Sequence, residues 1–323
     1  MPKPIVTISL VVPVYNSAES LHLLRDRVSK TFIEEIDEDY ELIFVDDGSS
    51  NPETWPTLAA LARDYREVRA LQLTRNFGRT GAVLAGICGA CGEWIVVMDD
   101  DLQHRPEDIS AMLSKREHDV VLAQFEDKAH GLVARIGSRV VTWLEHIVLG
   151  FPNHLTNSPF ILIRSSIAKH MLHMKSPHSF LTALYLEVTR DIVGVQATHE
   201  PRHYGKTQFS FFRRLKHFMN LLINNTAVLL RGVAVVGITM SLASLSFGCY
   251  LILQGPANVQ GWTSLMVITL IIGGLILMSL GVSGEYLIRI IRGIESRPSF
   301  LLRRETGSEA NLTEIKETRT HDL

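Results

Sequence analysis

Three consecutive aspartates and a nearby glutamine stand directly after an apolar run of the chain. Residues 94–98 are Trp-Ile-Val-Val-Met, and Asp99, Asp100, Asp101 and Gln103 follow them. A strand buried on both faces reads as such a run, and open α/β sheets place ligands beyond the carboxyl ends of their strands. If the chain stays extended, Asp99, Asp101 and Gln103 point to the same side. Mg²⁺ prefers such oxygen ligands together with substrate phosphates, so the segment indicates a metal–diphosphate site.

The same acidic segment would also fit a solvated turn before the helix that follows Pro106. We favour a binding site because polar motifs follow three further strand-like runs. These motifs are Val12-Pro13-Val14-Tyr15-Asn16, Asp46-Asp47-Gly48-Ser49 and Arg75-Asn76-Phe77-Gly78-Arg79. The carboxyl ends of parallel strands meet at one edge of a sheet, so we expect the four motifs to form one site. Taken alone, the second motif would also fit an ordinary turn, and Tyr15 a packed aromatic residue.

The elements that must position these motifs alternate along the first part of the chain. Strand-like runs are predicted at residues 5–14, 40–45, 68–73, 94–98 and 119–124. Helix-like stretches are predicted near residues 18–36, 53–65, 79–91 and 106–116. Strands alternating with helices predict an α/β fold with a mostly parallel sheet.

The last third of the chain has a different composition. Residues 232–253 and 262–284 contain no charged side chain, and each segment is long enough to cross a bilayer. Two buried helices of a soluble core would show polar faces, which neither segment has. We therefore predict two transmembrane helices. Over the 323 residues, 32 Lys and Arg balance 34 Asp and Glu, so the net charge gives no reason to expect a nucleic-acid partner.

Basic residues flank the two uncharged segments but not the connector between them. Residues 254–261 contain no Lys or Arg, whereas basic residues lie before the first segment and after the second. They are Arg213, Arg214, Lys216, Arg289, Arg292 and Arg297. The positive-inside rule then predicts a multi-pass protein of the inner (cytoplasmic) membrane with both termini in the cytoplasm. The apolar stretch 5–14 is short and reads as a strand, so no cleavable signal peptide is predicted.

The ordered motifs together with the two uncharged segments resemble the family 2 glycosyltransferases of the GT-A fold. Within them, the chain resembles the polyprenyl-phosphate glycosyltransferases, which include dolichol-phosphate mannose synthase and bacterial undecaprenyl-phosphate sugar transferases. The resemblance extends to Arg202-His203-Tyr204-Gly205-Lys206-Thr207 and to Gly284-Glu285-Tyr286-Leu287-Ile288-Arg289. It implies a Rossmann-like cytoplasmic GT-A domain at 1–208, an amphipathic interfacial helix at 209–225, two transmembrane helices with a short periplasmic loop at 226–288, and a cytoplasmic basic segment with a disordered tail at 289–323.

The resemblance also implies roles for individual residues. Those expected around the donor nucleotide are Pro13, Tyr15, Asp46, Asp47, Arg79, Asp99 and Asp100, with Asp46 hydrogen-bonded to the base. Those expected to ligate Mg²⁺ or Mn²⁺ are Asp99, Asp101 and Gln103. Those expected at the acceptor phosphate are Arg135, Arg139, Arg202 and Thr207, because guanidinium matches phosphate in geometry and charge. Catalytic roles are expected for Asp99, Asp101 and Arg202, although each arginine would also fit a solvated or membrane-surface charge.

Three departures from the family pattern fall in the expected pocket. Ser17 replaces a commonly acidic residue, residues 156–161 lack an Asp followed by an Arg, and Gln208 replaces a frequent Lys. Because of these departures, the sequence identifies neither the sugar that is transferred nor a general base. The expected function is inverting transfer of a sugar, with a UDP-sugar as the favoured donor, to a polyprenyl phosphate at the cytoplasmic membrane face.

Other functions and an assembly remain open from the sequence. The chain would also fit a glycosyltransferase acting on another membrane lipid or a lipid-linked glycan. A more distant alternative is a catalytically silent, sugar-nucleotide-binding subunit of a membrane complex, which the intact acidic cluster disfavours. Gly273, Gly274, Gly281 and Gly284 would allow close helix contact in a homo-oligomer.

Overall fold

The computed structural model describes residues 6–125, 146, 150–174, 180–198, 200, 239, 246, 262–294 and 298–307. The chain divides into two compact units, residues 1–208 with 298–323 and residues 209–297. Several sequence predictions lie outside the described residues. They are the sites Arg135, Arg139, Arg202 and Thr207, the interfacial helix 209–225, and the segment 232–253 apart from Thr239 and Ser246.

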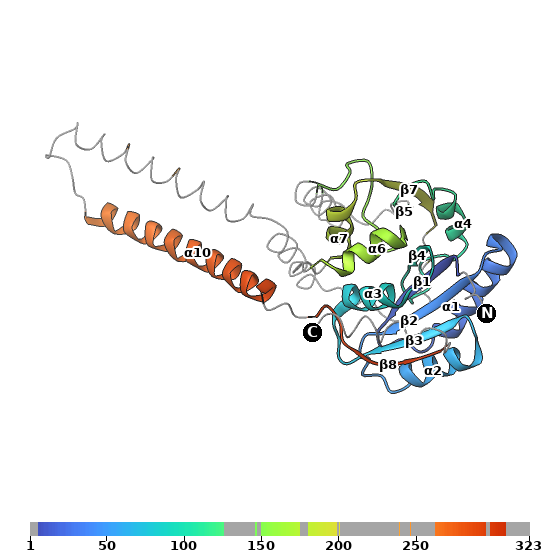
Figure 1. The fold of residues 1–323 in the computed structure, drawn as a ribbon. Helices are drawn as coiled ribbons and strands as arrows, with labels where there is room; N and C mark the ends of the chain where they lie inside the picture. The colour runs from blue at the N-terminus through green and yellow to red at the C-terminus, as the bar shows by residue number, and fades with distance from the viewer. Residues whose placement is uncertain are drawn as a thin grey trace. The chain divides into compact units, whose positions relative to one another are not determined.

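The first unit contains one mixed sheet with the strand order β7-β5-β6-β4-β1-β2-β3-β8 (Figure 1). The strands are β1 Ile8–Val14, β2 Tyr40–Asp46, β3 Val68–Leu73, β4 Trp94–Val97, β5 Val120–Phe125, β6 Ile161–Arg164, β7 Ile192–Ala197 and β8 Leu302–Thr306. Strands β4, β1, β2 and β3 run parallel to one another, as do β5 and β7. β6 and β8 are antiparallel to their neighbours. The predicted α/β fold with a largely parallel sheet is thus confirmed.

Helices cover both faces of this sheet (Figure 1). One face packs against α1 Leu21–Thr31, α2 Thr54–Asp64 and α4 Asp108–Leu113. The other packs against α3 Gly78–Gly89, α6 Ser165–Leu172 and α7 Leu181–Val188. Successive side chains of a strand point to opposite faces, so Leu10 and Val12 join the first layer while Val11 joins the second. All three are fully buried, which explains the continuous apolar runs of the central strands.

The five predicted strand-like runs coincide with β1 to β5, and the four helix-like stretches with α1 to α4, where a π-helical turn, η1 Phe32–Ile36, extends α1. The C-terminal strand β8 was not predicted, because the sequence placed residues 289–323 in a basic segment and a disordered tail. Instead, β8 pairs antiparallel with β3. Two contacts explain why this charged segment is ordered: Leu302 packs on the core, and Glu305 forms an ion pair with the buried Arg69 at 2.7 Å.

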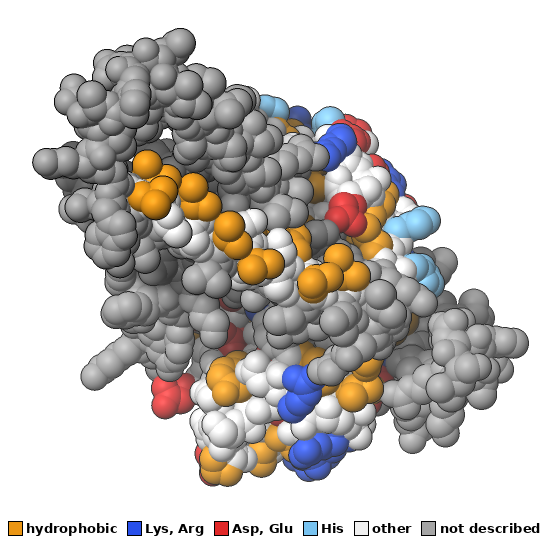
Figure 2. Space-filling view, turned by 90° about the vertical axis from the view of Figure 1, so that its left-hand side faces the viewer, with side chains coloured by type: hydrophobic (Ala, Val, Ile, Leu, Met, Phe, Trp, Pro, Cys, Tyr) orange, Lys and Arg blue, Asp and Glu red, His pale blue; other side chains and the backbone are white. Residues whose placement is uncertain are grey.

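The second unit contains α10 Trp262–Ile294, which includes the second uncharged segment. Large apolar side chains of α10 are exposed and contribute to the row of orange side chains in Figure 2. They are Leu265, Ile272, Ile276, Met278, Leu280, Leu287 and Ile290. No helix within the described ranges meets the combined length and apolarity of a membrane span. The two transmembrane helices stay a prediction from the sequence.

Candidate active site

The loop after β1 is fixed to the loop after β2 by one asparagine. Asn16 adopts a left-handed backbone conformation, φ 59°, which Asn tolerates better than most residues. Its Oδ1 accepts hydrogen bonds from the N–H groups of Ser50 at 2.8 Å and Asn51 at 2.9 Å. Its own N–H donates to Ser49 Oγ at 2.9 Å. The predicted motif contained Asn16, but sequence reasoning gave it no role.

The loop after β2 is in turn fixed to the start of α3. Asp47 Oδ1 accepts from the Phe77 N–H at 2.7 Å, and Asp47 Oδ2 from the Gly78 N–H at 2.9 Å. The first N–H groups of a helix have no partner within the helix, so this carboxylate satisfies two of them. Burial raises the pKa of Asp47, and the two N–H donors oppose that rise. Asp47 was predicted near the donor, and here it shapes the loop that precedes Arg79.

Asp46 is fully buried at the end of β2. Its Oδ1 accepts from the Ser49 N–H at 2.9 Å and its Oδ2 from Gln72 Nε2 at 2.8 Å. Direct contact with a base, as predicted, would require this carboxylate to become exposed. Tyr15 is 49% exposed, and Pro13 is half-buried on β1. The prediction that these two border a base is untested.

Arg79, on the first turn of α3, reaches the acidic loop after β4. Its Nε lies 2.7 Å from Asp99 Oδ1, and its Nη2 donates to the Pro159 carbonyl at 2.8 Å. The guanidinium therefore joins α3, the acidic loop and the loop before β6. Each of the four predicted motifs is thus linked by a hydrogen bond or ion pair to the next, so the four motifs lie together as expected. That they form one binding site stays a prediction.

The acidic loop is a turn rather than a continuation of β4. The strand ends at Val97, and Leu102 has a left-handed backbone, φ 59°. This conformation costs about 1–2 kcal/mol for an L-residue, but burying a leucine side chain gains about 1.5–3 kcal/mol, and Leu102 is fully buried. Asp101 Oδ1 accepts from the Gln103 N–H at 3.2 Å across the turn. The chain therefore does not stay extended after β4, so the condition under which Asp99, Asp101 and Gln103 would point to the same side is not met.

His104 supports this turn from the core and was missed by sequence reasoning. The side chain is buried, and Nδ1 accepts a hydrogen bond from the Asp99 N–H at 3.0 Å. The ring stacks on Phe125 and Phe160, with centroids 5.7 and 5.1 Å away. An accepting Nδ1 places the proton of the neutral ring on Nε2. The available signal was the position of a histidine immediately after the acidic cluster.

Asp100, the middle residue of the three, is partly buried. Its Oδ2 is buried and has no hydrogen-bond partner. Burial raises the pKa of Asp100 to about 7, a hydrogen bond from Ser17 opposes the rise, and the charges of Asp99 and Asp101 add to it. Ser17, one of the departures from the family pattern, therefore links the loop after β1 to the acidic loop.

The donor set of the acidic loop fits a divalent cation. Within the described ranges, no group of three or more His, Cys, Asp or Glu side chains is arranged to hold a metal ion. The predicted ligands are two carboxylates and one amide, Asp99, Asp101 and Gln103, a number that suits Mg²⁺ or Mn²⁺ retaining water and phosphate ligands. The Asp100 Oδ2 atom is buried without a hydrogen-bond partner, and a nearby cation would favour the charged form of this carboxyl. Metal binding is compatible with these residues and stays a prediction.

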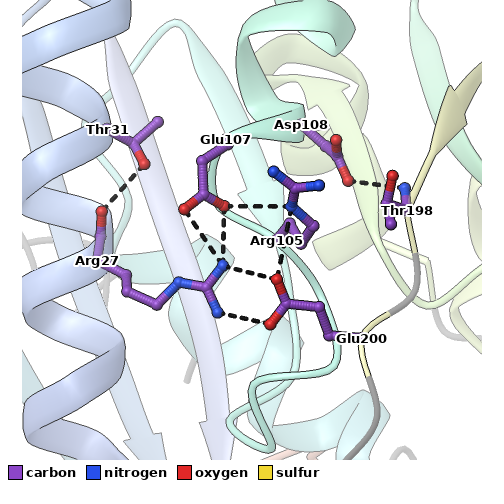
Figure 3. A network of polar contacts seen from close by, with 7 residues as sticks. All are labelled: Arg27, Thr31, Arg105, Glu107, Asp108, Thr198 and Glu200. Carbon is purple, nitrogen blue, oxygen red and sulfur yellow. Dashed lines mark hydrogen bonds and ion pairs between the residues drawn. The ribbon is translucent and has the colours of Figure 1, made fainter.

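An ion-pair network joins the acidic loop to the residues after β7 (Figure 3). Arg27 of α1 lies between two carboxylates, 3.0 Å from Glu107 Oε2 and 2.9 Å from Glu200 Oε2. Arg105 Nε lies 3.7 and 3.6 Å from the same two groups. The Glu200 N–H donates to the Gln103 carbonyl at 3.1 Å. Glu200, which lies just before the predicted acceptor segment 202–207 in the sequence, is therefore held against the acidic loop.

Removal of the central arginine of this network is expected to destabilise the first unit. Arg27→Ala leaves Glu107 and Glu200 close together with only the longer contacts to Arg105. The three side chains are no more than 30% exposed, so the cost should be roughly 1–3 kcal/mol, lowering Tm by roughly 2–12 °C. Thermal unfolding of the detergent-solubilised chain measures this.

A matched control is an arginine in an exposed ion pair. Arg63 pairs with Asp64 at the end of α2, and the side chains are 75% and 58% exposed. Arg63→Ala should change stability by less than about 0.5 kcal/mol. Equal effects of the two substitutions would contradict a structural role for the network.

A match to a known family covers the four linked motifs. Residues 9–155 match the family described as Glycosyl transferase family 2. Over these residues the chain is similar to glycosyltransferase family 2. The matched residues of the family 2 domain include β1 to β5, the four linked motifs and every described residue predicted at the donor or the metal.

Full-length relatives agree with the resemblance to polyprenyl-phosphate glycosyltransferases. The chain is 29% identical over 315 residues to the undecaprenyl-phosphate 4-deoxy-4-formamido-L-arabinose transferase of Yersinia pestis (strain Pestoides F), covering 95% of this chain and 96% of the relative. It is 29% identical over 310 residues to the enzyme of that name from Pseudomonas aeruginosa (strain LESB58), covering 94% and 91%. The resemblance stated from the motifs is confirmed.

A solved structure supports the fold of the family 2 domain. Glucosyl-3-phosphoglycerate synthase from Mycobacterium tuberculosis, in complex with Mn²⁺, UDP-glucose and phosphoglyceric acid, matches with a TM-score of 0.50 and 14% identity. The match covers 67% of this chain and 79% of that protein. At this identity the similarity concerns the GT-A-like fold alone.

Proposed function

We propose that this protein transfers a sugar from a nucleoside diphosphate sugar, with UDP as the favoured nucleotide, to undecaprenyl phosphate or a similar polyprenyl phosphate. The observation that carries the proposal is the linked set of strand-end loops, in which Arg79 meets Asp99, the first of three consecutive aspartates. The relatives from Yersinia pestis and Pseudomonas aeruginosa, similar over almost the whole chain, are undecaprenyl-phosphate transferases by name. Their similarity supports this acceptor class and a role in cell-envelope glycan or lipid modification.

The proposed reaction needs little acid–base chemistry from the protein. A phosphate monoester has a second pKa near 6, so a polyprenyl phosphate is already an anionic nucleophile at neutral pH. A phosphate oxygen bonds to the anomeric carbon while the bond from that carbon to the nucleoside diphosphate oxygen breaks. The electron pair leaves with the diphosphate, and the anomeric centre inverts. The missing Asp in residues 156–161 is compatible with this reaction.

The task of the described residues is then to hold the donor and to stabilise its leaving group. Asp99, oriented by Arg79 and by its N–H bond to His104, is proposed to hold the ribose and diphosphate end of the donor. Asp101 and Gln103 are proposed to ligate the divalent ion, which when bound would offset charge developing on the diphosphate. The structurally similar glucosyl-3-phosphoglycerate synthase holds Mn²⁺ and UDP-glucose, which supports this choice of probes.

A lipid acceptor also requires that the protein work at a membrane surface. We propose that the uncharged segments 232–253 and 262–284 anchor the protein in the cytoplasmic membrane, with both termini in the cytoplasm. The lack of charge in both segments and the exposed apolar side chains of α10 support this proposal. Resistance of the membrane-bound protein to extraction with carbonate at high pH would support the anchor. Complete extraction as a folded protein would contradict it.

The deciding experiment combines donor, acceptor and metal in one assay. Purified, detergent-solubilised full-length protein is incubated with Mn²⁺ or Mg²⁺, undecaprenyl phosphate and a panel of UDP-, GDP- and dTDP-sugars that includes UDP-4-deoxy-4-formamido-L-arabinose. The lipid product is read by mass spectrometry. The expected result is a new lipid-phosphate-sugar mass that disappears with EDTA.

Two results would overturn the proposal in different ways. Transfer only to diacylglycerol would indicate a different lipid acceptor. Nucleotide binding without product from any donor on the panel would indicate a sugar-nucleotide-binding subunit without activity. If the product still forms in EDTA, the proposed transferase activity stands and the proposed metal requirement is wrong.

A further inference from the structure

We infer that Arg304, on the C-terminal strand β8, is a positioning residue for the donor-nucleotide site. The inference rests on the proposed function, because it concerns the loop after β2 that would border the nucleotide. Arg304 and Gln72 are 232 positions apart in the sequence but in contact in space, since β8 follows α10 in the chain and pairs with β3.

A short relay of hydrogen bonds connects Arg304 to this loop. Arg304 Nε donates to Gln72 Oε1 at 2.7 Å. Gln72 Nε2 donates to Asp46 Oδ2 at 2.8 Å, and Asp46 Oδ1 accepts from the Ser49 N–H at 2.9 Å. Ser49 Oγ then accepts from the N–H of Asn16, in the loop that also contains the exposed Tyr15.

The Arg304 guanidinium and the Asp46 carboxylate favour the same orientation of the Gln72 amide. A glutamine side chain has one oxygen that accepts and one nitrogen that donates. Arg304 can only donate, so it holds Gln72 Oε1, and the amide nitrogen is left facing the Asp46 carboxylate. A flipped amide would place its oxygen against that carboxylate and leave the buried Asp46 Oδ2 without this donor. Arg304 thereby stabilises the orientation that keeps Asp46 and the Ser49 N–H in place.

Attachment of β8 to the sheet does not depend on Arg304. The neighbouring Glu305 pairs with Arg69 at 2.7 Å, and Arg69 in turn pairs with Glu41 at 2.8 Å. Arg69 and Glu41 are both buried, so this second contact anchors the strand. The Arg304 guanidinium lies at the other side of the strand, 4.4 Å from the centre of the Trp55 ring, where it faces Gln72. Strand attachment and loop positioning can therefore be separated by mutation.

The test compares three substitutions in the full-length protein. Arg304→Met keeps an unbranched stem over Trp55 and removes the guanidinium, and Arg304→Lys restores a donor for Gln72. Arg303→Met is the matched control, because Arg303 is an exposed arginine of the same strand whose Nη2 donates to the Thr74 carbonyl instead. The readouts are KM for the donor sugar, kcat, UDP affinity with Mn²⁺, and hydrogen exchange of the Ser49 amide.

Arg304→Met should raise KM for the donor and weaken UDP binding about fivefold to twentyfold, with kcat within about twofold. The Ser49 amide should exchange several-fold faster, and Arg304→Lys and Arg303→Met should stay near wild type. Unchanged KM and Ser49 exchange in a folded Arg304→Met protein would overturn the inference, as would equal effects of Arg303→Met. If the wild-type protein binds no nucleotide, the proposed function fails, and Ser49 exchange still decides whether the relay exists.

Discussion

Replacement of Asp101 by alanine is expected to lower sugar transfer by at least about 10²–10³-fold while the protein stays folded. Asp101 follows a fully buried strand, and the turn at Leu102 keeps it beside Gln103. In the proposed reaction its charge acts on the leaving diphosphate, where charge develops only as the bond to the sugar breaks. Loss of a group that acts there lowers kcat more than it raises KM.

A second substitution separates charge from structure at this position. Asp101→Asn keeps a side-chain oxygen that can accept from the Gln103 N–H but removes the negative charge. We expect it to be nearly as inactive as the alanine variant in the mass-spectrometric transfer assay. Asp64→Ala, which removes an exposed carboxylate at the end of α2, should transfer normally. Activity in the Asn variant but not in the Ala variant would reassign Asp101 to shaping the turn, and near-normal transfer by both would remove it from the site.

The elements around this site were predictable from sequence because each has a local signature. Strands buried on both faces require long apolar runs, which made β1 to β4 visible with boundaries within a few residues of those observed. Parallel strands bring their carboxyl ends to one edge, so motifs dozens of residues apart could be assigned to one site. The order of the elements along the chain was sufficient for this assignment. It did not reveal that the Asp46 carboxylate is buried.

The internal support of the site was not predictable in the same way. Leu102 is the residue that turns the acidic loop, yet a left-handed leucine has no sequence signature, since it depends on a core space that only the folded chain provides. The stacking of His104 on Phe160 and the pairing of Arg27 with Glu200 join residues 56 or more positions apart. β8 was not predicted because its charged side chains are typical of a disordered tail. Its ion pair between Glu305 and Arg69 joins residues far apart in the sequence and can be recognised only in the folded chain.

A substitution at Gly48 is expected to separate two of the linked loops. Gly48 has φ +64°, and a Cβ atom there would lie 2.5 Å from the Arg75 carbonyl carbon and 2.8 Å from the Asn76 nitrogen. Both contacts are with backbone, so no side-chain rotation relieves them. In Gly48→Ala the loop after β3 must move away from Asp47, which holds the start of α3 through the N–H groups of Phe77 and Gly78.

The expected loss for Gly48→Ala is roughly 2–4 kcal/mol, because left-handed strain and overpacking act together, and Tm should fall by roughly 4–16 °C. Donor affinity should fall at least about tenfold, since Arg79 follows the displaced turn and would no longer meet Asp99 at 2.7 Å. Gly78→Ala is the matched control: Gly78 also has a positive φ, +83°, but a Cβ there would meet nothing within 4 Å. It should cost only the strain of about 1–2 kcal/mol. Equal losses of stability and of UDP affinity in the two variants would show that backbone strain alone, and not the close approach of the loops after β2 and β3, accounts for the effect.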